Sequence, residues 1–364
     1  MHFNAADDNG DVARPDSPEF MALARSLSVQ AASLDQSGDW PQFQLDQCSK
    51  AGIFRWFVDS TRGGIGCGDA DILRGYLHLS AACLTTTFVL TQTTGALRRI
   101  AASSAPIVDQ VLEDLLSGRA LASLGISHLT TSHRHLGKRV LAAKSRGEGF
   151  VLEGFSPWVT GSPQIDKIVV GAEMEDGRQI LALVSMDLPG VSFDTPTPLM
   201  ALTGSQTGAV RFDQVIVQAD AILAGPEYDV LVGATGASTG GLQTSALAIG
   251  LADSAIDIIE QQSVARSDLQ SPADRLRAEQ GQARKDLLAL ATGDQVCPPA
   301  ELRKRANSLA IRGSQAALAA VKGAGYVEGH PAGRLCREAL FFLVWSCPQP
   351  VMAANLCELA GLTE

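Results

Sequence analysis

The spacing of apolar residues in this chain changes twice, and that pattern restricts the fold more than any other feature. Between residues 17 and 118, apolar side chains recur at helical spacing, most clearly from Asp69 to Leu97. From about 120 to 225 the spacing shifts toward two, in short runs separated by turns such as Asp176-Gly177. Helical spacing returns beyond the glycine-rich stretch 233–241. The pattern predicts helices, then a β unit, then helices.

The elements expected in each part decide the fold class. Strands are expected at 139–144, 150–153, 167–170 and 179–184. Because no helical segment separates them, we expect an antiparallel sandwich or barrel in place of βαβ units. Bundle helices are expected at 242–266, 273–292, 300–324 and 334–345. We predict an α+β protein with an N-terminal helical domain (1–119), a middle antiparallel β domain (120–228) and a C-terminal four-helix bundle (229–364).

Composition narrows the classes of function. The chain has 364 residues and a formal net charge of −10, which argues against broad binding to nucleic acid or to anionic membranes. No run of about 18 uncharged apolar residues is present, and the polar, acidic start has no signal-peptide pattern, so a cytoplasmic location is expected. The seven cysteines are scattered and never spaced C-x-x-C, which indicates buried thiols without disulfides or zinc.

Four segments resemble landmarks of the acyl-CoA dehydrogenases, in the order in which that family has them. Residues 63–66 (GGIG) resemble the Y-G-G-x-G turn, and 158–161 (WVTG) resemble W-I-T-N. Residues 200–215 (MALTGSQTGAVRFDQV) are similar to M-G-L-R-G-S-x-T-A-x-V-x-F-D-D-V, the most specific match. Residues 326–339 (YVEGHPAGRLCREA) resemble Y-x-x-x-x-P-x-x-R-x-x-R-D-A. Four modest matches with the correct spacing form a strong combined resemblance along nearly the whole chain.

The resemblance implies an FAD cofactor, a small-molecule substrate with an acyl-CoA as candidate, and a homodimer or homotetramer. Trp158 would lie against the flavin ring, because an indole is a flat apolar wall. Thr160 and Ser127 would supply hydroxyl groups to flavin nitrogen or oxygen atoms. Arg266 would reach the FAD pyrophosphate of a neighbouring subunit. The polar loop with Ser132 and His133 would lie at the mouth of the substrate site.

Ordinary structural roles also account for these residue types. Trp158 is equally typical of a core aromatic at a strand end, and Thr160 and Ser127 of common strand residues. Arg266 is typical of a solvated arginine at a helix end. The histidines at 128, 133 and 135 lack a neighbouring carboxylate, so no metal site is predicted. The glycines at 64, 66 and 68 are not preceded by a strand, which argues against a dinucleotide loop.

The catalytic glutamate of the family has no counterpart at either of its usual places. Ser346 occupies the position after the R-D-A-like segment, and a serine hydroxyl abstracts no carbon-bound proton unless another group activates it. The alternative location, 240–245 (GGLQTS), also lacks a carboxylate. Asp253 and Asp257 lie further along the same predicted helix, with no orientation fixed by the sequence.

Motifs that hold FAD in the family are also changed. Residues 319–325 (AAVKGAG) replace Q-x-x-G-G-Y-G, and Leu269-Gln270 replace a Phe-Gly pair. Weakened FAD affinity is expected, with FMN or a diffusible reduced flavin as alternatives. Three hypotheses follow: a flavin-dependent oxidoreductase that oxidises an acyl thioester with a non-standard base, a flavin monooxygenase on the same scaffold, or a non-catalytic subunit that pairs with an active homologue.

Overall fold

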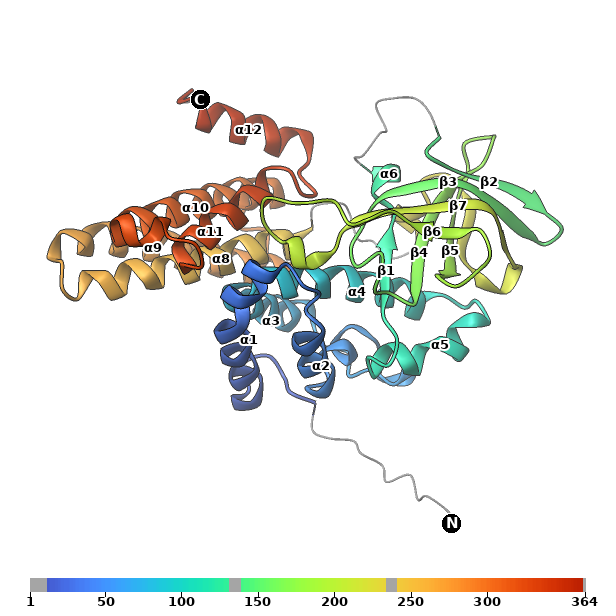
Figure 1. The fold of residues 1–364 in the computed structure, drawn as a ribbon, viewed down its shortest axis with the longest axis horizontal. Coiled ribbons are helices and arrows are strands. Elements are labelled where there is room, and N and C mark those ends of the chain that lie inside the picture. The colour runs from blue at the N-terminus through green and yellow to red at the C-terminus, as the bar shows by residue number, and fades with distance from the viewer. Residues whose placement is uncertain (1–11, 131–138, 234–240, 363–364) are drawn as a thin grey trace, which may run out of the picture.

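The computed structural model describes residues 12–130, 139–233 and 241–362. Ser132 and His133, the two residues expected at the substrate mouth, lie outside the described residues. The expected order of helices, β unit and helices is confirmed (Figure 1). In Figure 1 the sheet lies to one side, the bundle helices project to the other, and the N-terminal helices lie beneath both.

The N-terminal helices begin and end at recognisable signals. Ser17 accepts a hydrogen bond from the Phe20 amide at 3.2 Å, and Gly38 ends the first helix in the left-handed region (φ 65°). The helices of this part are α1 (Pro18–Ser37), α2 (Gln42–Lys50), α3 (Asp69–Ala82), α4 (Leu84–Ala102) and α5 (Ile107–Leu116).

The single helical segment expected from Asp69 to Leu97 is divided at Cys83. Cys83 is extended (φ −156°, ψ 105°), so α3 ends and α4 starts in a new direction. The carbonyl of Cys83 accepts hydrogen bonds from both the amide and the hydroxyl of Thr87, at 3.1 and 2.8 Å, and so begins α4. As a result α4 passes under the sheet and contacts β1, while α3 packs against the C-terminal bundle.

The β unit is one sheet of mixed strand direction. The strands are β1 (Ala122–Gly125), β2 (Leu141–Arg146), β3 (Gly149–Val159), β4 (Lys167–Glu173), β5 (Gln179–Ser185), β6 (Val191–Phe193), β7 (Gly208–Val217) and β8 (Ile222–Glu227). Their order is β6-β7-β3-β2-β4-β5-β8, with β1 paired to β4. The expectation of a wholly antiparallel sheet was wrong for the β1–β4 and β2–β4 pairs, which are parallel. The antiparallel β2–β3 hairpin separates β1 from β4 in the chain, and β4 then runs parallel to β1.

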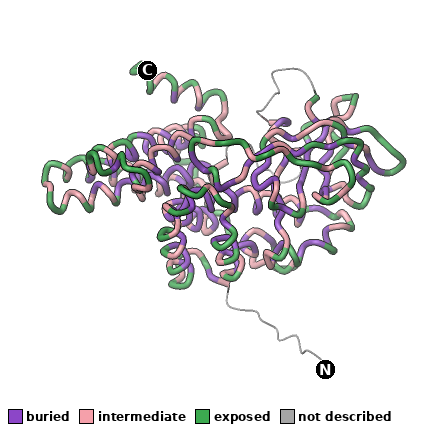
Figure 2. Tube along the Cα trace, in the orientation of Figure 1, coloured by how far each residue is buried: buried purple, intermediate pink, exposed green. Residues whose placement is uncertain are grey.

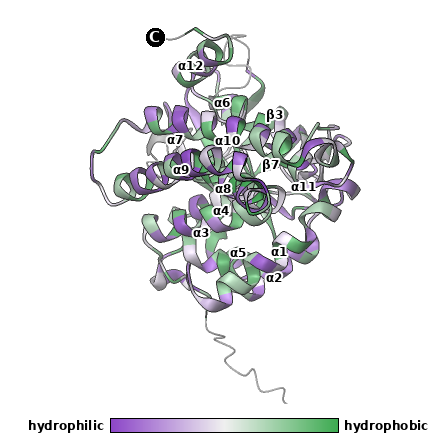
Figure 3. Ribbon diagram, turned by 90° about the vertical axis from the view of Figure 1, so that its left-hand side faces the viewer, coloured by the Kyte–Doolittle hydropathy of each residue, from purple (hydrophilic) through white to green (hydrophobic). Residues whose placement is uncertain are grey.

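The C-terminal helices pack around α8, which is buried along much of its length (Figure 2). They are α8 (Leu242–Ser263), α9 (Gln270–Ala291), α10 (Pro299–Val321), α11 (Pro331–Ala339) and α12 (Gln349–Leu359); short helices α6 (Ser127–Thr130) and α7 (Val230–Gly233) flank the sheet. The small-residue face expected in α10 contacts α8, where Ala306, Ala310 and Ala317 are fully buried. Coloured by hydropathy, the view along the bundle shows apolar and polar residues alternating around its helices (Figure 3).

Among the described helices, α8 alone has the length and hydropathy that a membrane span requires. Within its most apolar window, 67% is buried inside the protein against α3, α9 and α10. This helix is therefore the core of the bundle. A helix not expected from the sequence, α12, extends beyond the bundle in Figure 1 and buries only Val351 and Asn355.

Candidate functional site

Trp158 stands at the end of β3 with its side chain turned outward. It is 47% exposed, whereas the next residue, Val159, is fully buried. The pairing of β3 with β7 shifts register between Ser156 and Val159, and this irregularity re-aims the side chains at the strand end. A large exposed indole at a strand end is available as a flat platform, and it is not part of the packed interior.

Thr160 follows directly and joins a short chain of hydroxyl groups. Its Oγ1 lies 3.3 Å from Oγ1 of Thr207, which in turn lies 2.9 Å from Oγ of Ser205. The Gly161 amide also donates to the Ser205 carbonyl at 2.9 Å. The motif at 200–215 thus holds the loop after Trp158. Sequence reasoning noted this motif but assigned no role to Ser205 or Thr207.

Ser127 begins α6, immediately after the loop that leaves β1. Its Oγ is buried and has no hydrogen-bond partner among the residues that the structure describes, and α6 packs against β3, the strand that carries Trp158. Buried hydroxyl groups are normally hydrogen-bonded, so one without a protein partner is the feature expected where a cofactor completes the bond. The structure therefore supplies an available hydroxyl at the position expected to contact a flavin.

His128, the residue after Ser127, has a structural contact. It is buried, and its Nε2 lies 2.7 Å from the carbonyl oxygen of Gly171 in β4. A Cβ at Gly171 would lie 2.3 Å from Cδ1 of Leu129, so a larger residue there would displace the Leu129 side chain of α6. His128 and Gly171 together fix the short helix that positions Ser127. His133 and His135 lie outside the described residues.

Arg266 lies at the end of the bundle and is engaged within its own chain. Its Nη1 donates to the carbonyl of Ala320 at 2.7 Å, and its Nη2 lies 3.1 Å from Asp268. A guanidinium at the last carbonyls of α10 satisfies acceptors that the helix end leaves open. The nearby side chains of Val264, Tyr326 and Val327 are exposed at 89%, 88% and 64%. Exposed apolar side chains thus occur near the chain positions that meet at the Arg266–Ala320 hydrogen bond.

Ser346 lies in a turn held by a buried arginine. Its φ is +45°, a left-handed conformation that is uncommon for serine. The preceding carbonyl, of Trp345, accepts a hydrogen bond from Nη2 of Arg303 at 3.1 Å. The Trp345 ring stacks on Phe341 with centroids 5.0 Å apart and planes 11° apart, and Phe88 of α4 contacts both rings edge-on. The position of the family's base thus carries a hydroxyl beside an aromatic cluster.

Asp253 and Asp257 of α8 both form ion pairs with Arg277 of α9. Arg277 contacts Asp253, lies 2.6 Å from Asp257 and lies 2.8 Å from Glu260. Burial and the charge of Asp253 raise the pKa of Asp257, whereas the hydrogen bond from Arg277 lowers the pKa of Glu260. The two aspartates of α8 that remained open as bases are therefore used to join two bundle helices.

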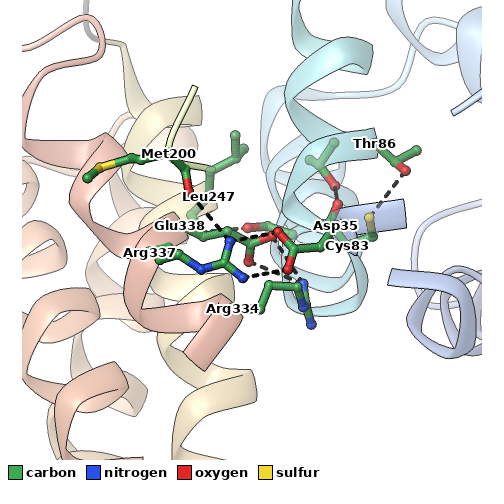
Figure 4. A network of polar contacts seen from close by, with 10 residues as sticks. Asp35, Cys83, Thr86, Met200, Leu247, Arg334, Arg337 and Glu338 are labelled. Carbon is green, nitrogen blue, oxygen red and sulfur yellow. Dashed lines mark hydrogen bonds and ion pairs between the residues drawn. The ribbon is translucent and has the colours of Figure 1, made fainter. Parts of the chain in front are cut away.

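A second ionic network uses the R-x-x-R-D-A-like segment in α11. Arg337 forms a bidentate pair with Asp35 of α1 at 2.9 and 2.6 Å, and Arg334 contacts both oxygens of Glu338 at 3.2 and 3.1 Å. Figure 4 shows these four side chains pointing toward one another between the two helices. Glu338 is 1% exposed, and burial raises the pKa of its carboxyl group. The motif joins residues 302 positions apart in the sequence.

Comparisons with known proteins agree with this architecture. No protein-family model matches the chain. A protein of Bacillus subtilis described as a probable acyl-CoA dehydrogenase is 22% identical over 337 residues, covering 86% of this chain and 88% of its own length.

Two solved structures have the same fold. A glutaryl-coenzyme A dehydrogenase in complex with glutaryl-CoA superposes with a TM-score of 0.80 at 16% identity, over 100% of this chain and 98% of its own. The dibenzothiophene monooxygenase of a Paenibacillus strain gives 0.77 at 17% identity, over 94% of this chain and 95% of its own.

Proposed function

The chain belongs to the acyl-CoA dehydrogenase superfamily, and on this premise we propose that it is a flavin-dependent oxidoreductase. A flavin is the expected cofactor of such a chain, and FAD is the form that we propose. The observation that carries the proposal is the exposed indole of Trp158, followed by the Thr160 hydroxyl and approached by α6 with the unpartnered hydroxyl of Ser127.

The residues of the chain divide the work of holding this cofactor. Trp158 would cover one face of the planar ring and exclude water from it. Thr160 and Ser127 would hydrogen-bond to its polar atoms, and His128 would keep Ser127 in place through the Gly171 carbonyl. Bound flavin supplies the redox chemistry of the site. Cytoplasmic location belongs to the proposal as well.

The absence of a carboxylate at Ser346 favours a second candidate, a flavin monooxygenase. Dehydrogenation of an acyl thioester requires a base for the proton next to the carbonyl group. Ser346 is not such a base, and Asp253 and Asp257 are paired with Arg277. A monooxygenase with the same fold is among the similar structures. Within the proposal, an acyl-CoA remains the candidate substrate for dehydrogenation, with a base still to be identified.

The absorbance spectrum of the purified protein tests the proposal. Flavin absorbs visible light where protein does not, so a yellow protein, or one that becomes yellow with added FAD or FMN, is expected. Anaerobic bleaching by an acyl-CoA would support dehydrogenation, whereas oxygen consumption with reduced flavin would support the monooxygenase. A protein with no affinity for FAD, FMN or reduced flavin contradicts the proposal and favours a non-catalytic subunit.

Replacing Trp158 by alanine is expected to weaken flavin binding about 5- to 150-fold, because stacking of a planar heterocycle on an aromatic side chain contributes about 1–3 kcal/mol. Titration of flavin fluorescence measures the change. Tyr228→Ala removes another exposed aromatic, 68% exposed and distant in sequence, and should leave the affinity unchanged. Equal affinity of Trp158→Ala and the unmodified protein would show that the ring lies elsewhere.

The Ser127→Ala variant should weaken flavin binding without lowering the stability of the flavin-free protein. Loss of one hydrogen bond is expected to weaken flavin binding about 2- to 12-fold, since such a bond contributes about 0.5–1.5 kcal/mol. Without flavin, the variant should be as stable as the unmodified protein or more so, because Oγ of Ser127 has no hydrogen bond to any described residue that could be lost. Thermal unfolding with and without flavin measures both effects. A variant destabilised equally in both conditions would indicate a purely structural serine.

We also propose that the chain forms a homodimer or homotetramer through the bundle end that carries Val264, Tyr326 and Val327. Exposed apolar side chains close together are typical of subunit contacts. In such an assembly, Arg266 would face the neighbouring subunit, where its remaining donors are available to a phosphate. Light scattering of the purified protein measures the assembly, and a Tyr326→Asp variant should shift it toward the monomer.

A further inference from the structure

Arg303 differs from the other cations of α10 in having no carboxylate partner. Arg305 lies 2.8 Å from Asp286, Arg312 lies 2.5 Å from Glu279, and Lys304 lies 3.4 Å from Glu301. Arg303 is 1% exposed and forms no ion pair with any described residue. Its Nε and Nη1 have no hydrogen-bond partner in the described structure. A buried guanidinium of this kind is costly, because burial removes its hydration and no carboxylate of the described residues neutralises it.

The contacts that Arg303 does make all lie at the turn with Ser346. Its Nη2 donates to the carbonyl of Trp345, and its guanidinium carbon lies 5.9 Å from the centre of the Phe342 ring. Burial lowers the pKa of Arg303 to about 10, so the group still carries its charge at neutral pH. The nearest titratable group that acts on it is the thiol of Cys347, whose own pKa is raised by burial, so this thiol is neutral at pH 7. The positive charge is thus uncompensated at this turn.

The same turn presents aromatic rings that are not fully covered. Phe341 and Trp345 are stacked and only partly buried, and Phe88 closes the cluster from α4 with its ring edge toward both. Stacked and edge-on arrangements are those in which aromatic rings attract one another most strongly. A further planar ring could join this cluster from its exposed side. Arg303 donates to the backbone carbonyl of Trp345, so its charge lies beside the turn that carries this ring pair.

We propose that the turn at Ser346, with Phe341, Trp345 and Arg303, binds a small planar aromatic anion of the aryl carboxylate or phenolate class. The ring of the ligand would pack against the Phe341–Trp345 pair, and its negative charge would be stabilised by Arg303. A carboxylate base at residue 346 would repel such a ligand, whereas the hydroxyl of Ser346 can donate a hydrogen bond to it. This inference rests on the proposed function, because the resemblance alone places Ser346 in the active site.

The experiment compares a charged probe with a neutral one of the same shape. Purified protein loaded with flavin is titrated calorimetrically with sodium benzoate and, separately, with benzamide. Benzoate is expected to bind about tenfold or more tightly than benzamide, because a charge-assisted hydrogen bond or ion pair contributes about 1.5–3 kcal/mol. Equal affinities, or no binding of benzoate to flavin-loaded protein, would overturn the proposal.

Three variants test the charge and the aromatic ring separately. Arg303→Met should bind flavin with unchanged affinity but lose the preference for benzoate over benzamide. Arg303→Lys retains a positive charge and should therefore keep part of the preference for benzoate. Phe341→Leu should weaken benzoate and benzamide alike, because it removes the stacking ring. If flavin fails to bind the unmodified protein, the proposed function fails. If flavin binds and Arg303→Met still prefers benzoate, only the aromatic-anion proposal fails.

Discussion

Replacing Arg334 by methionine is expected to lower the free energy of unfolding by about 3–5 kcal/mol, the cost of removing one partner of a buried ion pair. Arg334 and Glu338 are 8% and 1% exposed, so water cannot solvate the remaining carboxylate. The loss should be smaller at about pH 5 than at about pH 8. Burial raises the pKa of Glu338, and without the arginine its carboxyl group can be neutralised only by a proton. Urea unfolding at the two pH values measures both effects.

A matched control uses an arginine–carboxylate pair at the surface. Arg119 lies 2.7 Å from Asp114, and their side chains are 61% and 53% exposed. Arg119→Met should therefore change the free energy of unfolding by less than about 1 kcal/mol. The double variant Arg334→Met/Glu338→Leu should recover much of the stability that Arg334→Met loses, because no buried charge remains. A single variant as stable as the unmodified protein would show that the pair is hydrated in solution.

Substituting alanine at Gly64 is expected to destabilise the protein by about 3 kcal/mol or more, at the upper end of the cost of overpacking. A Cβ at this position would lie 1.8 Å from the carbonyl oxygen of Val58 and 2.3 Å from its carbonyl carbon. These are backbone atoms, which no change of side-chain rotamer can move away. The segment around Gly64 is held in place by hydrogen bonds from the amides of Gly66 and Cys67 to the carbonyl oxygens of residues 58 and 56.

Gly68 provides the control for this substitution. It precedes α3 in the same turn, its φ is −64°, and no atom lies within 4 Å of a Cβ built there. Gly68→Ala should therefore cost about 1 kcal/mol or less, consistent with the loss of a preferred residue at a helix start. Urea unfolding of both variants gives the comparison. Similar values for the two glycines would mean that the turn adjusts to Gly64→Ala by a backbone shift.

Local patterns in the sequence predicted the architecture, because helices and strands follow directly from the spacing of apolar residues. The helix–sheet–helix order is confirmed, and the resemblance to acyl-CoA dehydrogenases agrees with relatives and solved structures that match most of the chain. Gly64 lies in the glycine turn that the sequence indicated, whereas its close approach to the Val58 carbonyl is seen only in the structure. The roles of Trp158, Thr160, Ser127 and Arg266 toward a cofactor stay predictions, although Trp158 has the exposure that its role requires.

Other features depended on which residues meet in space. The break at Cys83 and the parallel β1–β4 pair were missed because the spacing of apolar residues does not report where an element turns or which strand it meets. The sequence left Asp253 and Asp257 open as bases, and only the packing of α9 against α8 pairs them with Arg277. Arg303 and Arg305 are two arginines only two positions apart in α10. Of the two, only Arg305 has a carboxylate partner among the described residues. Burial and charge pairing depend on contacts between segments far apart in the chain, so the sequence determined the scaffold and tertiary structure determined the electrostatics of its site.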